Sequence, residues 1–326
     1  RSLHDEIIAY ARYIAPTRAE DAARERVRAC VEDVVMRTRF HDGRVSAFGS
    51  SVTGLCLPNG DIDLVVQTRH VQTENNKRGA LFLLRNALLR DGIVREAFVV
   101  TNARHLVMNM VSSDETGAFK VDISVNSTEG TRGMALIREY LRALPALRPL
   151  VMVLRGLLAQ HGLGAATSAG LSSYVTICMA ISFLQLNPAG LPREALENPF
   201  DSGSLGALLL GFLQYYADDF PYTTSYISVR EQAVLPKVAK SWPPRKHEDA
   251  LSIECLVDPE NDIARAAQRI GAVRELFRKT RDTLRAAADD STGASSSALA
   301  SVLGVSQDVG VPFLSVCPPA HDRACR

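Results

Sequence analysis

The sequence lacks a charge excess, a paired-cysteine motif and a long apolar run. Its 37 Lys and Arg nearly balance 36 Asp and Glu, for a formal net charge of +1, so bulk electrostatics alone cannot hold a polyanion. Its six cysteines occur singly, without CxxC or zinc-type spacing, which excludes a zinc module and a small disulfide scaffold. The longest apolar stretches, such as 205–213, are far shorter than the ~20 residues that a membrane-spanning helix needs.

These absences also indicate a compartment. Scattered cysteines are typical of thiols kept reduced inside cells, and the charged residues 1–6 have no signal-peptide pattern. We therefore expect an intracellular protein without a membrane partner. With 326 residues, 46% hydrophobic and 22% charged, the chain is long enough for two globular domains with real cores.

The first part of the chain predicts a mixed helix-and-strand unit. Helical spacing over 3–14 stops at Pro16, and Thr17 and Glu20 form a capping box for a helix reaching about Met36. Strand patterns then follow at 45–48, 61–66, 94–101, 105–111 and 120–125, with a helix at 75–89. Residues 17–130 are therefore expected to form an α+β domain whose sheet is covered on one face by helices.

The remainder reads as a mainly helical domain. Helical patterns occupy 134–144, 148–161, 171–186, 205–219 and 263–288. The first helix has an apolar face but no obvious sheet partner, so we expect residues 1–16 to join 131–326 in this domain. The segment 289–297, rich in Ser, Ala, Gly and Asp, predicts a linker or mobile loop.

Two carboxylates near position 60 carry the clearest chemical signal. Asp61 and Asp63 are two residues apart on a predicted strand, so both side chains leave one face while Ile62 and Leu64 enter the core. Adjacent carboxylates repel each other without a cation between them, and a hard divalent ion such as Mg²⁺ removes that cost. Asp122 lies on another alternating strand and would complete the set if the two strands are neighbours.

A short polar turn precedes these carboxylates. Gly49-Ser50 ends a strand where a helix can begin, and this arrangement suits a triphosphate. Together with Asp61, Asp63 and Asp122 it matches a two-metal nucleotidyl-transfer site, with two Mg²⁺ or Mn²⁺ ions. The alternative, that Asp-x-Asp beside Pro58 is only a turn motif, explains neither Gly49-Ser50 nor the third carboxylate.

These motifs resemble the DNA polymerase beta nucleotidyltransferase superfamily. The segments 48–50 and 57–63 resemble those of template-independent RNA-tailing enzymes, the noncanonical poly(A) polymerases and terminal uridylyltransferases. The resemblance is strongest to the nuclear poly(A) polymerases of the TRAMP type. The resemblance extends from 8–16 to 297–305. It implies a polymerase-beta-like nucleotidyltransferase sheet domain, a mainly helical PAP/associated central domain, and a nucleotide held between them.

The resemblance also implies a nucleotide pocket. The segments 148–155, 170–174 and 251–265 are similar to family segments that bind the triphosphate and the base. Besides Gly49 and Ser50, the implied nucleotide-binding residues are Arg155, Ser173, Tyr174, Asp258, Asn261, Asp262 and Arg265. The chain departs from the family where Arg155 replaces a lysine, where Ala159 replaces a second one, and where Cys255-Leu256 replaces Asp-Pro.

Base choice rests on few positions. Discriminating uridylyltransferases often carry His where this chain has Asn261, and an Asn where it has Gly133; an amide can pair with an adenine edge. The resemblance therefore favours ATP, and template-independent addition of AMP to RNA 3′ ends. The segment 172–174 would also suit a uridylyltransferase, and terminal uridylyl transfer with UTP is the alternative activity. An inactive scaffold and a small-molecule nucleotidyltransferase are less favoured.

Partners and location follow only from the resemblance. Besides the RNA 3′ end and ATP, it implies a nuclear protein to which an RNA-binding zinc-knuckle protein and a helicase deliver RNA. The chain has no RRM, KH or zinc-knuckle motif of its own. Basic residues recur across 69–104, where a solvated helix face and an RNA-backbone contact are equally compatible with the pattern.

Overall fold

The structure is a computed structural model that describes residues 2–58, 60–101, 106–127, 129–289 and 297–304. The chain forms two compact units. Of the described residues, the sheet unit contains those in 15–135, and the helical unit contains those in 2–14 and 136–304.

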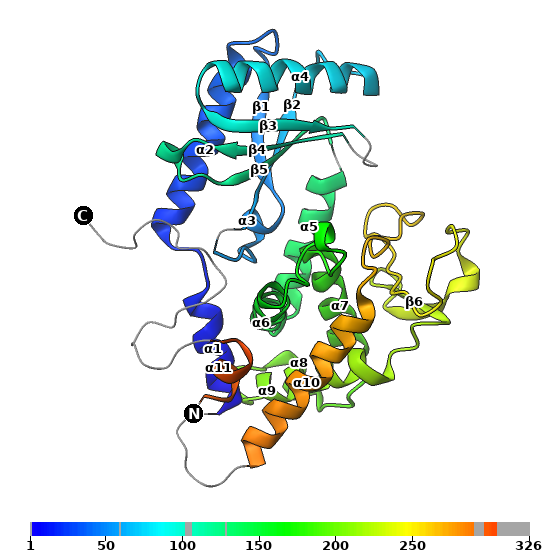
Figure 1. The fold of residues 1–326 in the computed structure, drawn as a ribbon. Helices are drawn as coiled ribbons and strands as arrows, with labels where there is room; N and C mark the ends of the chain where they lie inside the picture. The colour runs from blue at the N-terminus through cyan, green and yellow to red at the C-terminus, as the bar shows by residue number, and fades with distance from the viewer. Residues whose placement is uncertain (1, 59, 102–105, 128, 290–296, 305–326) are drawn as a thin grey trace. The chain divides into compact units, whose positions relative to one another are not determined.

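The sheet unit is built on five strands in the order β1-β2-β5-β4-β3 (Figure 1). The strands are β1 (Arg44–Phe48), β2 (Ile62–Gln67), β3 (Val94–Val100), β4 (Val107–Ser112) and β5 (Lys120–Val125). The central pair β2/β5 is parallel, and β1/β2, β4/β5 and β3/β4 are antiparallel.

Two helices pack on this sheet, α2 (Arg18–Met36) and α4 (Glu74–Arg90). Helix α2 begins at the predicted capping box, in which Thr17 and Glu20 bond each other's backbone N–H groups. Val27, Val31 and Val34 recur every three to four residues on one side of α2 and are buried against the strands. This core covers one side of the sheet.

The helical unit contains α1 (Leu3–Tyr13), α6 (Leu147–Gln160), α7 (Ser173–Leu186), α8 (Arg193–Glu197), α9 (Leu205–Gln214), α10 (Ile270–Asp289) and α11 (Ala298–Val302). Helix α5 (Glu129–Ala143) contains the boundary between the units. The apolar face of α1 packs on α6 and α9. A short hairpin, β6 (Ser225–Ser228) with β7 (Ala233–Pro236), completes the unit.

Several elements differ from expectation. Strand β2 starts at Ile62, so Asp61 lies just before it, and the helix predicted from 263 begins only at Ile270 because 263–269 form turns. A π-helical turn, Tyr215–Asp219, follows α9. The proposed linker at 289–297 lies mostly outside the described residues. Within the described part of the chain, no helix is both long and apolar enough to cross a bilayer.

Candidate active site

The parallel pairing of β2 with β5 places two of the three predicted carboxylates together. Asp63 is the direct register partner of Asp122, and directly paired residues of neighbouring strands point to the same face of a sheet. Their neighbours Leu64 and Ile123 are fully buried on the other face. The alternation of each strand therefore sends its apolar residues into the core and its carboxylate away from it.

A third strand fixes the orientation of Asp122. Asn109 on β4 is the antiparallel partner of Asp122, and its Nδ2 donates a hydrogen bond of 2.6 Å to Oδ1 of Asp122. Met108 and Met110, on either side of Asn109, are buried in the core. Asn109 therefore points to the same face as Asp122. Its hydrogen bond to Oδ1 fixes the orientation of the carboxylate and so sets the direction of Oδ2.

The turn after β1 closes on Asp63. Phe48, the last residue of β1, is paired with Asp63, and Gly49 then turns with φ of +72°, a conformation that favours glycine. A Cβ at position 49 would lie 2.0 Å from Oδ2 of Asp63. Only glycine lets the backbone approach this carboxylate so closely. Ser50 follows as the first residue of the short helix α3 (Ser50–Thr53).

Asp61 is exposed and lies one residue before β2. Its backbone oxygen accepts a hydrogen bond of 3.4 Å from Nη1 of Arg24, which is buried. The Arg24 guanidinium also lies over the Phe119 ring, 5.0 Å from its centroid. Through Arg24, helix α2 therefore supports the chain where it enters the strand that carries Asp63.

The donor chemistry of this face fits a divalent metal. Across the described residues, no set of three or more His, Cys, Asp and Glu side chains is already gathered as a metal cluster. Asp63 and Asp122 nevertheless point the same way from paired positions, an arrangement that repulsion disfavours without a cation. Carboxylate oxygens are the ligands that Mg²⁺ prefers, so Asp61, Asp63 and Asp122 are residues that could hold it.

In the helical unit, the structure brings Tyr174 to the segment 251–265. Tyr174 lies in the first turn of α7, which Ser172 caps and Ser173 begins. Its hydroxyl is 3.8 Å from Sγ of Cys255, and burial raises the pKa of Tyr174. The residue is therefore a neutral aromatic ring beside the segment whose Asn261 is the predicted base reader.

The same segment is held by a buried carboxylate. Oδ1 of Asp262 accepts hydrogen bonds from the N–H groups of Ile253 and Ala264, each 3.0 Å long. Its Oδ2 pairs with Nη1 of Arg245 at 2.7 Å. Both oxygens of Asp262 are thus engaged within the protein, and we propose that it positions this segment instead of contacting a nucleotide.

The remaining predicted residues differ in exposure. Oδ1 of Asp258 accepts the N–H of Glu260 in a local turn, and Asn261 is tied to the backbone through Asp258 and Cys255. Arg155 is partly buried on α6. Arg265 is exposed, and its Nη1 donates to the carbonyl oxygen of Pro243 at 3.3 Å, which directs it towards the segment that contains Arg245.

Sequence reasoning missed Asn109 and Arg245. For Asn109 a signal was present: a polar residue between two methionines on a predicted strand shares the face of any carboxylate opposite it. Arg245 had no comparable signal, because its partner Asp262 is 17 residues away across an irregular segment.

Two family models and several solved structures match this chain. Residues 3–142 match the family described as the central palm domain of poly(A) RNA polymerase, mitochondrial-like. Residues 204–262 match the Cid1 family poly A polymerase. Among solved structures, the polymerase core of TRAMP, an RNA surveillance complex, is 26% identical, with a TM-score of 0.79 over 92% of this chain and 93% of that one.

Curated relatives point the same way. Poly(A) RNA polymerase CID14 of Cryptococcus neoformans is 34% identical over 84% of this chain and 35% of its own length. Trf4-2 of Drosophila melanogaster, described as an inactive noncanonical poly(A) RNA polymerase, is 32% identical over 84% of this chain and 66% of its own length. The chain spans 35% to 47% of the length of each of the first five curated relatives.

The sheet order, the paired carboxylates and these matches have one common explanation. The fold is a polymerase-beta-like nucleotidyltransferase palm with a mainly helical associated region. The chain belongs to the noncanonical poly(A) RNA polymerases of the DNA polymerase beta nucleotidyltransferase superfamily.

Proposed function

We propose that this chain is the polymerase core of an RNA adenylyltransferase, which adds AMP from ATP to RNA 3′ ends without a template. The observation that carries the proposal is the pairing of Asp63 with Asp122 on one sheet face, directly against the backbone of Gly49. A merely structural sheet gains nothing from two adjacent carboxylates.

Asp61, Asp63 and Asp122 would hold two divalent ions, Mg²⁺ or Mn²⁺. Such ions, when bound, lower the pKa of an attacking hydroxyl and neutralise a leaving pyrophosphate. Asn109 keeps Asp122 in one orientation, and Gly49 keeps the backbone close to Asp63. We assign Asn109 as a positioning residue because it acts through Asp122.

The helical unit would bind the nucleotide base. Tyr174 offers a ring for stacking, which is blind to base identity. Selectivity must then come from the 258–261 segment beside it, where the amide of Asn261 can both donate to and accept from an adenine edge. We propose ATP as the substrate and keep UTP as the alternative. By similarity to the TRAMP core, we also propose a nuclear role with an RNA-binding partner and a helicase.

Transfer of labelled nucleotide to a short RNA tests this proposal. The unmodified chain should extend RNA with ATP and Mg²⁺, and Asp63→Asn should lose activity many thousandfold, because two-metal chemistry depends on this ligand. Asp33→Asn, at a side chain 70% exposed on α2, is the matched control and should retain activity. Near-normal activity of Asp63→Asn would refute the two-metal mechanism.

A further inference from the structure

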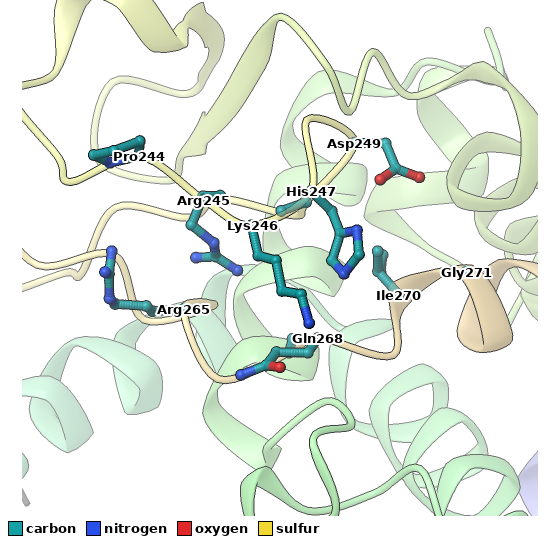
Figure 2. Close-up of a pocket in the computed structure, with 11 residues that line it drawn as sticks. Pro244, Arg245, Lys246, His247, Asp249, Arg265, Gln268, Ile270 and Gly271 are labelled. Atoms are coloured by element: carbon teal, nitrogen blue, oxygen red, sulfur yellow. The ribbon is translucent and has the colours of Figure 1, made fainter.

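A pocket of about 470 Å³ lies entirely within the helical unit. It is formed by two stretches, 244–250 and 265–271. Figure 2 shows the side chains of Arg245, Lys246 and His247 projecting from the first stretch towards the second, which carries Gln268 and Ile270. Apart from Arg265, none of the predicted site residues lines it.

The pocket carries more positive than negative charge. Asp249 is the one carboxylate in its lining and faces Arg274 at 3.8 Å, and the nearby Asp262 pairs with Arg245 at 2.7 Å. Glu248, next to Asp249 in the chain, is exposed and does not line the pocket. In the described part of the chain, no carboxylate forms an ion pair with Lys246 or Arg265, and both are exposed. Two cations therefore remain for a ligand.

The backbone adds to this field. Ile270 and Gly271, which begin α10, line the pocket. The 20-residue helix has no acidic residue in its first turn, and the N-terminus of a helix carries partial positive charge with unpaired N–H groups. Burial lowers the pKa of Arg245; Asp262 opposes this, and the charge of Arg265 lowers it further. The cations are thus close enough to repel each other, and an anion would relieve that repulsion.

The lining also limits the kind of anion. It contains no Phe, Tyr or Trp side chain, and its one aromatic ring is the imidazole of the exposed His247, so its cations favour the charge of a phosphate over the face of a nucleobase. Lys246, His247, Arg265 and Gln268 are all exposed, which suits a polymer that passes over a surface. We infer that this pocket binds a backbone phosphate of the RNA chain, independently of sequence.

This inference rests on the proposed function, because RNA is its substrate. It changes one assignment: Arg265, which the resemblance places with the nucleotide-binding residues, donates to Pro243 and lines this pocket. It also explains how a chain with a net charge of +1 could hold RNA, since a local concentration of cations suffices where the overall charge does not.

Fluorescence anisotropy with labelled oligo(A) and oligo(U) tests the inference on the whole chain, without added nucleotide. Lys246→Ala should weaken binding of both oligomers equally, by about three- to tenfold at moderate salt, and should lower the slope of log affinity against log salt by about 0.7, the value for one single-strand phosphate contact. Lys279→Ala, a 75% exposed lysine on α10 outside the pocket, is the matched control and should change neither quantity.

Three outcomes would overturn the inference. The first is equal RNA binding by Lys246→Ala and Lys279→Ala, and the second is a loss that depends on the base. The third is a rise in the KM for ATP in Lys246→Ala while RNA binding stays unchanged, which would assign the pocket to the free triphosphate. A chain that binds RNA through Lys246 but transfers no nucleotide would support this inference and overturn the proposed function.

Discussion

The hydrogen bond from Asn109 to Asp122 gives the sharpest structural prediction. It is 2.6 Å long and ends on a carboxylate, and hydrogen bonds to charged groups contribute about 1.5–3 kcal/mol. Removing a group that orients a metal ligand typically costs about 10- to 100-fold in metal affinity or activity. Asn109→Ala should therefore raise the Mg²⁺ concentration for half-maximal transfer by about that factor, with the KM for ATP unchanged.

The assay is RNA extension across a Mg²⁺ titration, with thermal unfolding measured on the same samples. Asn75→Ala, at an exposed asparagine on α4 of the same unit, is the matched control. A purely structural role would lower the unfolding temperature without moving the Mg²⁺ requirement. A Mg²⁺ titration of Asn109→Ala identical to that of the unmodified chain would refute the positioning argument.

Three further substitutions test other parts of the site. Gly49→Ala should abolish most activity, because its Cβ would meet Asp63, whereas Gly92→Ala, with a similar φ of +69° but open space around it, should cost only about 1 kcal/mol of stability and leave transfer intact. Asp262→Ala should lower the free energy of unfolding by about 3 kcal/mol because it removes a buried carboxylate that accepts two backbone hydrogen bonds and leaves the partly buried Arg245 without its partner; denaturant unfolding decides this, and a loss under about 0.5 kcal/mol, typical of a surface change, would contradict it. Asn261→His should shift kcat/KM towards UTP by roughly tenfold or more, and an unchanged ratio of ATP to UTP use would remove Asn261 from base selection.

Strong local patterns were enough to predict much of the fold. The capping box of α2 and the alternation around Asp122 are local in sequence, so their elements occur where the patterns place them. The helix predicted from Ile263 was wrong at its start. Oδ1 of Asp262 accepts the N–H groups of Ile253 and Ala264 and Oδ2 pairs with Arg245, and these bonds hold the following residues in turns. Such tertiary bonds override local helical spacing.

The site was predictable to a similar extent. Long-range pairing decides which strands are neighbours, and local patterns do not reveal it. The sequence therefore predicted only that Asp63 and Asp122 meet if their strands are adjacent, and β2 and β5 are paired in that register. Asn109 could have been inferred from the same alternation once β4 was known to lie beside β5. The basic pocket joins residues about 20 positions apart through turns, and no periodic pattern marks such a surface.

The proposed activity requires that this chain transfer AMP to RNA through the carboxylate face of its sheet. The most direct measurement compares extension of a short labelled RNA by each of the four nucleoside triphosphates, with Mg²⁺, for the unmodified chain. We expect extension with ATP, about tenfold to a hundredfold better than with the other three nucleotides. No extension with any nucleotide would contradict the claim of catalysis, and preferential extension with UTP would make the chain a terminal uridylyltransferase instead.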